Sequence, residues 1–228
     1  MKLAALFTGG KDSTYAIHLL KEKGHEIACL ITVKSKNPDS YMFHTPAIEL
    51  TGLQAEAMGL PIIIGETKGE KEKELKDLER VIKEAKEKFN FEGIITGALF
   101  SEYQSSRIEK ICDKLGLKCL SPLWHKSQEE HMCELLENDF KIILTAVAAD
   151  GLDKSWLNKI ITMEDLDKLK ELNKKIGFHV AFEGGESESL VIDCPLFKKK
   201  LKIIESEKLM ENSFTGRLII KKAILIDK

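Results

Sequence analysis

The hexapeptide Thr-Gly-Gly-Lys-Asp-Ser at residues 8–13 carries the residue types that hold a phosphate group. It follows the short apolar run at residues 3–7 and opens a segment with helix-like apolar spacing that ends at Gly24. Glycines let backbone N–H groups approach an anion closely, and a helix N-terminus contributes roughly half a positive charge. The pattern therefore predicts a phosphate site where a strand turns into a helix.

This hexapeptide is not a Walker A loop. Ala5 stands where the first Walker A glycine would be, and Asp12 rather than serine or threonine follows Lys11. The alternative is a tight turn in which Thr8, Asp12 or Ser13 only caps the helix. Two glycines alone would favour that alternative, whereas the whole hexapeptide in this position favours phosphate binding.

The hexapeptide resembles the SGGKDS signature of the PP-loop ATP pyrophosphatase family, with Thr8 in place of the first serine. That family cleaves ATP between the α- and β-phosphates and releases AMP and pyrophosphate. By this resemblance Lys11 neutralises charge on the phosphates, and Asp12 orients Mg2+ or its waters. Otherwise Lys11 is a solvated helix lysine, and Asp12 is a carboxylate favoured by the helix dipole. The residues expected to hold the pyrophosphate end are Thr8, Gly9, Gly10 and Ser13.

Four further motifs follow the hexapeptide. They are SYMFHT at residues 40–45, a stretch at residues 97–109 that ends in YQSSRIE, GLD at residues 151–153 and EGGE at residues 183–186. Together the motifs resemble the diphthine–ammonia ligase family in its short, archaeal-type form, over residues 3–197. The resemblance implies an α/β fold with a Rossmann-like PP-loop nucleotide domain, a smaller α+β domain after it, and the site in the cleft between them.

The diphthine–ammonia ligase family adds the last amide to diphthamide, a modified histidine of translation elongation factor 2. A carboxylate is a poor acyl donor, so it must first attack the α-phosphate of ATP and form an acyl-adenylate, from which ammonia displaces AMP. The resemblance therefore implies ATP and Mg2+ as cofactors. The implied partners are ammonium and elongation factor 2 that carries diphthine.

The stretch at residues 97–109 supplies several candidates. Gly97 joins the ATP-binding set. Arg107 is the candidate for binding a phosphate or the substrate carboxylate, because a guanidinium offers two parallel donors. Its alternative is a surface ion pair with Glu109 or a neighbour. Tyr103 and Gln104 either line the substrate pocket or cap and pack the start of the helix.

A polar loop expected after the second strand contributes two more candidates. His44 is a candidate for proton transfer from ammonium or for contact with the substrate, although a lone histidine is more often a packing residue. Met42 either contacts adenine or packs in the core. The sequence leaves both alternatives open.

Glu183 and Glu186 bracket a glycine pair after a strand-like run at residues 179–182. A sharp turn there would present both carboxylates at a loop tip, where they bind the trimethylammonium group of diphthine or help to deprotonate ammonium. The alternative is a solvated acidic turn. Ser187 and Ser189 depart from the family pattern EGGE-aromatic-x-Thr, and the missing ring removes a cation–π contact with the substrate.

The alternation of apolar runs with amphipathic helices predicts a parallel sheet in the first half of the chain. This alternation weakens after Pro122, where helix, strand, helix and several strand-like runs follow. We therefore predict a PP-loop ATP-binding domain at residues 1–121 and a smaller α+β substrate domain at residues 122–228. The second domain is also the candidate for contacts in a homo-oligomer.

The composition of this 228-residue chain limits the classes of partner that it can bind. The net charge of -2 provides no global positive field, so nucleic acid is not expected as a partner. No apolar run approaches the roughly 18 residues that a membrane helix needs. The five cysteines include no CxxC pair, which argues against a disulfide framework and a zinc ribbon. We expect a cytoplasmic protein without membrane association.

Two rival functions remain at this stage. Another PP-loop adenylating enzyme, such as a tRNA thiolase or lysidine synthase, would act on a polyanion, which the near-neutral charge and the absence of cysteine pairs disfavour. A regulatory module would hold ATP or AMP on the same scaffold without chemistry, because a fold does not fix a function. That module predicts nucleotide binding without turnover.

Overall fold

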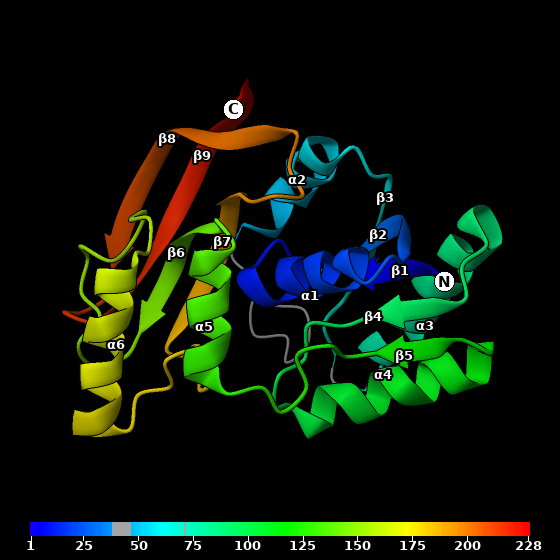
Figure 1. Ribbon diagram of the computed structural model, residues 1–228, viewed down its shortest axis with the longest axis horizontal. Coiled ribbons are helices and arrows are strands. Elements are labelled where there is room, and N and C mark those ends of the chain that lie inside the picture. The colour runs from blue at the N-terminus through cyan, green and yellow to red at the C-terminus, as the bar shows by residue number, and fades with distance from the viewer. Residues whose placement is uncertain (38–46, 71) are drawn as a thin grey trace.

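The computed structural model describes residues 1–37, 47–70 and 72–228, and two sheets dominate this part of the chain (Figure 1). The first is a five-stranded parallel sheet with the order β3-β2-β1-β4-β5, and the second is a four-stranded antiparallel sheet with the order β7-β6-β9-β8. The predicted fold class, a Rossmann-like parallel sheet followed by a smaller α+β unit, is confirmed.

The parallel sheet and its helices occupy the first half of the chain. Its strands are β1 (Lys2–Leu6), β2 (Glu26–Ser35), β3 (Ile62–Thr67), β4 (Gly93–Ile95) and β5 (Lys118–Leu120). The helices are α1 (Lys11–Glu22), η1 (Ile48–Leu50), α2 (Thr51–Met58), α3 (Glu74–Phe89) and α4 (Glu102–Leu115). The strand order reverses at β1, whose carboxyl end therefore lies at the topological switch point where open α/β sheets bind ligands.

Two hydrophobic layers cover the parallel sheet. Helices α3 and α4 pack on one face, where the buried cluster includes Leu78, Ile82, Ile94 and Ile111. Helix α1 covers the other face and lies between the two sheets, with β7 and α5 on its far side (Figure 1). Burial on both faces explains why the parallel strands read as continuous apolar runs in the sequence.

The antiparallel sheet and its helices follow. They are α5 (Gln128–Glu137), β6 (Lys141–Ala148), α6 (Met163–Ile176), β7 (Ser187–Asp193), β8 (Lys199–Met210) and β9 (Thr215–Asp227). Strands β8 and β9 form a long hairpin. Helix α6 begins with a capping box, in which Thr162 and Asp165 satisfy each other's backbone N–H groups. None of the described helices combines the length and the apolar character needed to cross a membrane.

One local expectation was wrong. Residues 179–182 were predicted as strand-like, but they form a turn-rich loop in which Phe182 has a left-handed backbone with φ of 64°. The carboxylate of Glu186 accepts the backbone N–H groups of His179 at 2.9 Å and Gly184 at 2.8 Å. Because the loop satisfies these donors internally, the segment does not need a neighbouring strand.

Candidate active site

Hydrogen bonds between two hydroxyl-bearing residues hold the loop between β1 and α1 in its conformation. Gly10 is the N-cap of α1, and Gly9 has a left-handed backbone with φ of 79°, which favours glycine. The hydroxyls of Thr8 and Ser13 lie 3.1 Å apart, and Ser13 Oγ also accepts the Thr8 N–H at 3.3 Å. The predicted strand, glycine loop and helix are therefore in place, with the first N–H groups of α1 at the switch point.

Two other elements fix the position of this loop. The carbonyl oxygen of Gly9 accepts hydrogen bonds from Gln54 Nε2 of α2 at 2.9 Å and from the backbone N–H of Val191 in β7 at 3.0 Å. Gln54 Nε2 also donates to the Val191 carbonyl at 2.8 Å. The buried Gln54 amide thus ties the phosphate loop to the antiparallel sheet.

Lys11 is almost completely buried beside this loop. Its backbone N–H donates to Ser189 Oγ at 3.1 Å, and its Nζ lies 2.7 Å from Asp12 Oδ2 and 5.6 Å from the centroid of the Phe182 ring. Lys11 is only 3% exposed, and a buried ammonium group needs a charged partner. These contacts rule out the alternative of a solvated helix lysine.

Ser189 offers a test of the link between β7 and the first turn of α1. We expect Ser189→Ala to lower the free energy of unfolding by about 1 kcal/mol, because the buried Lys11 N–H loses its acceptor. Ser189→Thr keeps a hydroxyl and should lose much less. Urea denaturation of both variants measures the difference. Equal losses in the two variants would show that this hydrogen bond does not stabilise the fold.

Charged groups around the phosphate loop shift the pKa values of Asp12 and two glutamates. Burial would raise the pKa of Asp12, but the Lys11 charge and the hydrogen bond and charge of His131 lower it to about 2. Burial raises the pKa of Glu183 to about 7, and the negative charges of Asp12, Glu186 and Glu188 add to this rise against the opposing charge of Lys11. Perturbed carboxylates of this kind concentrate at functional sites.

Glu188 behaves in the same way as Glu183. Burial raises its pKa to about 7, opposed by Lys11 and reinforced by Asp12. The predicted partner of Glu183, Glu186, has a different place: its two oxygens hold backbone N–H groups of the loop. These contacts make Glu186 a turn-stabilising residue, whereas Glu183 and Glu188 both interact electrostatically with Lys11 and Asp12.

Gly97 lies against the start of α1. A Cβ atom built on Gly97 would stand 2.6 Å from the backbone nitrogen of Ser13 and 2.8 Å from the carbonyl carbon of Asp12. Only glycine allows the chain after β4 to approach the phosphate loop this closely.

We expect Gly97→Ala to lower the free energy of unfolding by about 1–3 kcal/mol, because the new methyl group meets the backbone of α1 rather than a flexible side chain. Gly52→Ala is the matched control. Gly52 lies in α2, nothing lies within 4 Å of its Cβ position, and alanine favours helix. Urea denaturation of both variants checks this prediction, and equal stability of the two would contradict the close approach.

Arg107 and Tyr103 form a separate cluster on α4. Arg107 donates to Glu72 Oε1 from Nη2 at 2.6 Å and from Nε at 3.1 Å, and its guanidinium carbon lies 3.4 Å from the centroid of the Tyr103 ring. The Tyr103 hydroxyl donates to the same Glu72 oxygen at 3.0 Å. Gln104 donates its backbone N–H to the N-cap residue Ser101. The described contacts of Arg107 are thus with the segment before α3 and with its own helix.

The remaining two candidates, Met42 and His44, lie outside the residues that the structure describes.

Comparison with known proteins places both halves of the chain in one family. The profile of the diphthamide synthase N-terminal domain matches residues 1–119, and that of the diphthamide synthase C-terminal domain matches residues 127–226. This chain belongs to the diphthine–ammonia ligase family. Proteins named diphthine–ammonia ligase from Mus musculus and Homo sapiens are both 38% identical to it. The mouse alignment covers 93% of this chain and 86% of the relative, and the human alignment covers 91% and 84%.

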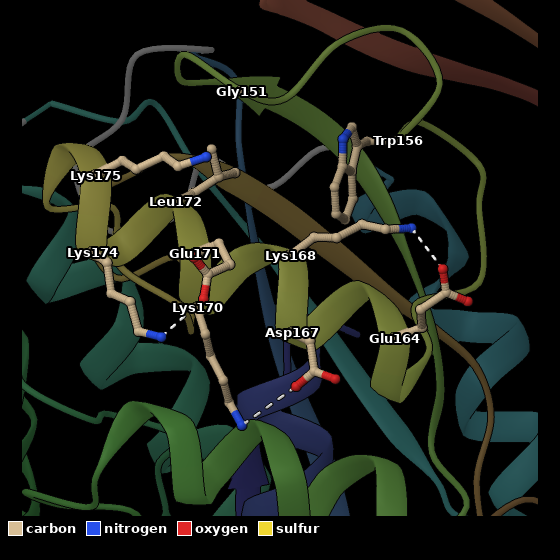
Figure 2. A pocket seen from close by; sticks show the side chains of 10 residues that line it. All are labelled: Gly151, Trp156, Glu164, Asp167, Lys168, Lys170, Glu171, Leu172, Lys174 and Lys175. Atoms are coloured by element: carbon tan, nitrogen blue, oxygen red, sulfur yellow. Dashed lines mark hydrogen bonds and ion pairs between the residues drawn. The ribbon is translucent and has the colours of Figure 1, made fainter.

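Family membership directs attention to the GLD motif, which builds a turn. Leu152 is fully buried, and Asp153 Oδ1 accepts the backbone N–H of Ser155 at 2.8 Å. Gly151 lines a surface groove of about 700 Å3 with Trp156 and residues of α6 (Figure 2). In Figure 2 three α6 lysines, Lys168, Lys170 and Lys174, pair with acidic side chains of the same helix, and Lys174 lies 2.8 Å from Glu171. This arrangement is typical of a solvated helix face, and we do not assign the groove to ligase chemistry.

Three residues at the candidate site were not among the sequence candidates. They are Gln54, His131 and Glu188. Glu188 lies two residues after Glu186 of the EGGE motif, which is only a weak signal that it belongs to the same site. Gln54 and His131 carry no local signal, because their roles depend on contacts with residues 45 and 119 positions away.

Proposed function

We propose that this protein is an AMP-forming C–N ligase that amidates diphthine on translation elongation factor 2, using ATP and ammonium and giving diphthamide, AMP and pyrophosphate. Membership of the diphthine–ammonia ligase family supports the substrate and the reaction. The observation that carries the chemistry is the buried Lys11 at the start of α1, beside a glycine loop that β7 holds in place.

The donors at this loop suit the phosphates of ATP. Backbone N–H groups at a helix start, the hydroxyls of Thr8 and Ser13 and the Lys11 ammonium are the groups that bind phosphate in proteins. Gly9, Gly10 and Gly97 let the backbone come close. In this proposal Lys11 neutralises negative charge that develops as pyrophosphate leaves.

Mg2+ is a finer part of the proposal, and Asp12 is the residue assigned to it. The two oxygens of Asp12 already face Lys11 Nζ and His131 Nε2 at 2.7 Å each. Mg2+ retains several waters and is often held by one or two carboxylates together with substrate phosphates. We therefore assign Asp12 to the waters of the ion, which leaves its two protein contacts in place.

A second set of residues is assigned to substrate binding and proton transfer. Glu183 is proposed to take a proton from ammonium, because its raised pKa suits a base near neutral pH. Glu186 supports this role by holding the loop. Arg107 is proposed to bind the substrate carboxylate by exchanging it for that of Glu72. Tyr103, Gln104, His44 and Met42 complete the proposed set of contacts with substrate and adenine.

The proposal also includes the division of the chain and its location. Residues 1–121 would form the ATP-binding domain, which also contributes Arg107 and its neighbours to the substrate, and residues 122–228 would form the smaller α+β substrate domain. The pairing of Val191 and Ser189 with the phosphate loop supports a site shared by both parts. A cytoplasmic location is proposed because a translation factor is the substrate.

The decisive experiment mixes the purified protein with ATP, Mg2+, ammonium and elongation factor 2 that carries diphthine. AMP, pyrophosphate and the mass of the modified histidine are then measured. We expect AMP and amidated diphthine to form together and only when ammonium is present. Binding of ATP with neither product, on substrate that an established ligase can amidate, would reject the proposal in favour of a regulatory module or another PP-loop substrate.

A further inference from the structure

His131 contacts Asp12 at the phosphate loop, although the two residues are 119 positions apart in the sequence. It lies in α5 and is completely buried, and its Nε2 is 2.7 Å from Asp12 Oδ1. The other oxygen of Asp12 lies 2.7 Å from Lys11 Nζ. Asp12 therefore divides its carboxylate between a lysine of its own helix and a histidine from the second half of the chain.

The ring nitrogen that faces Asp12 is the hydrogen-bond donor. Asp12 forms an ion pair with Lys11, and an ionised carboxylate can only accept hydrogen bonds. The opposite nitrogen, His131 Nδ1, is buried without a hydrogen-bond partner among the described residues. The ring therefore contacts Asp12 through Nε2 alone, and Nδ1 takes no part in this contact.

A second network holds the His131 ring in place. The Tyr15 ring packs against it with 5.5 Å between centroids and an interplanar angle of 52°. The Tyr15 hydroxyl donates to Glu134 Oε2 at 2.8 Å, and Glu134 also pairs with Lys126. The ring is thus fixed by residues of α1, α5 and the segment before α5.

We infer that His131 is a positioning residue, which holds one oxygen of Asp12 and so prevents Asp12 from pairing with Lys11 through both oxygens. Without His131 the carboxylate is free to turn fully onto the Lys11 ammonium. The Lys11 ammonium would then bind phosphate less well, because both oxygens of Asp12 would already accept hydrogen bonds from it. This inference rests on the proposed assignment of Lys11 to the phosphates of ATP.

The test compares His131→Gln with His131→Asn. The glutamine amide nitrogen reaches about as far as Nε2, whereas the asparagine nitrogen reaches only to the place of Nδ1, so the pair differs in reach and keeps the same chemical group. We expect roughly 10-fold weaker ATP binding for His131→Asn, measured by calorimetry, and most of the affinity to return in His131→Gln. Thermal denaturation is followed in parallel, and equal affinity losses in both variants would overturn the inference.

A double-mutant cycle separates an effect through Asp12 from a general structural effect. In an Asp12→Ala background, His131→Asn should weaken ATP binding no further, because the group it positions is gone. Additive losses would overturn the inference. His131→Leu serves as the disrupting variant if His131→Asn does not fold. The cycle measures ATP binding alone, so it remains decisive even if the amidation assay rejects the proposed function.

Discussion

Replacing Lys11 with alanine is expected to lower pyrophosphate release by roughly 10²- to 10³-fold, the size of effect seen when one preorganised charge-stabilising group is removed. Lys11 is the buried cation of the phosphate loop, held by Asp12 and lying over the Phe182 ring. Its loss also removes the positive charge that opposes the raised pKa values of Glu183 and Glu188. Both the phosphate end and the carboxylates of the site are therefore affected.

Two further variants make this result interpretable. Lys11→Met retains an unbranched side chain that packs near Phe182 but lacks the charge, so it should lose activity as Lys11→Ala does while unfolding at a temperature closer to wild type. Lys21→Ala removes an exposed lysine from the last turn of the same helix and should leave pyrophosphate release unchanged. Near wild-type activity in Lys11→Met would remove Lys11 from the phosphate site.

The local elements of the first half could be predicted because each carries its own signal. The apolar run of β1, the glycine loop and the apolar face of α3 all appear within short windows of sequence. The antiparallel half was less predictable, since its order depends on distant pairing such as β6 with β9. The prediction for residues 179–182 was wrong for a different reason, because side chains rather than a neighbouring strand satisfy part of that backbone: Glu186 accepts the His179 N–H, and Gln128 accepts the Ala181 N–H.

The phosphate loop itself was predictable, but the groups that complete it were not. Sequence spacing placed Lys11 and Asp12 at the helix start. Their partners come from elsewhere: Ser189 from β7 and His131 from α5. In the sequence Ser189 stands out only as a departure from the family's threonine, whereas in the structure its hydroxyl accepts the Lys11 N–H. Single-residue patterns cannot reveal such partners, because the fold alone brings them together.

The second large effect concerns the pH dependence of amidation. Ammonium must lose a proton before its nitrogen can attack an acyl-adenylate, and the proposed base is Glu183. Burial raises the pKa of Glu183 to about 7. A base acts in its deprotonated form, so the rate should rise as pH increases through about 7 and fall below it. General base catalysis of this kind contributes roughly 10²- to 10⁴-fold, which sets the expected loss in Glu183→Gln.

The neighbours of Glu183 determine how this profile must be read. Asp12, Glu186 and Glu188 raise its pKa, and Lys11 lowers it. Glu188 also has a pKa raised to about 7, so the two carboxylates titrate in the same range and the measured value belongs to the pair. A single profile of the wild-type protein would not assign the base to either residue.

Matched variants show which of the two glutamates is the base. The pH dependence of amidation is measured for the wild type, Glu183→Gln and Glu188→Gln at the same total ammonium, so that the change in free ammonia with pH is common to all three. We expect Glu183→Gln to lose the rise in rate near pH 7 that the other two proteins show. Glu188→Gln should keep the rise with its midpoint at a lower pH, because the negative charge of Glu188 no longer raises the pKa of Glu183. Loss of the rise only in Glu188→Gln would transfer the role of base to Glu188. Its place in β7, next to the serine that holds the Lys11 N–H, would then make the strand itself, rather than the glycine turn before it, the element that presents the base.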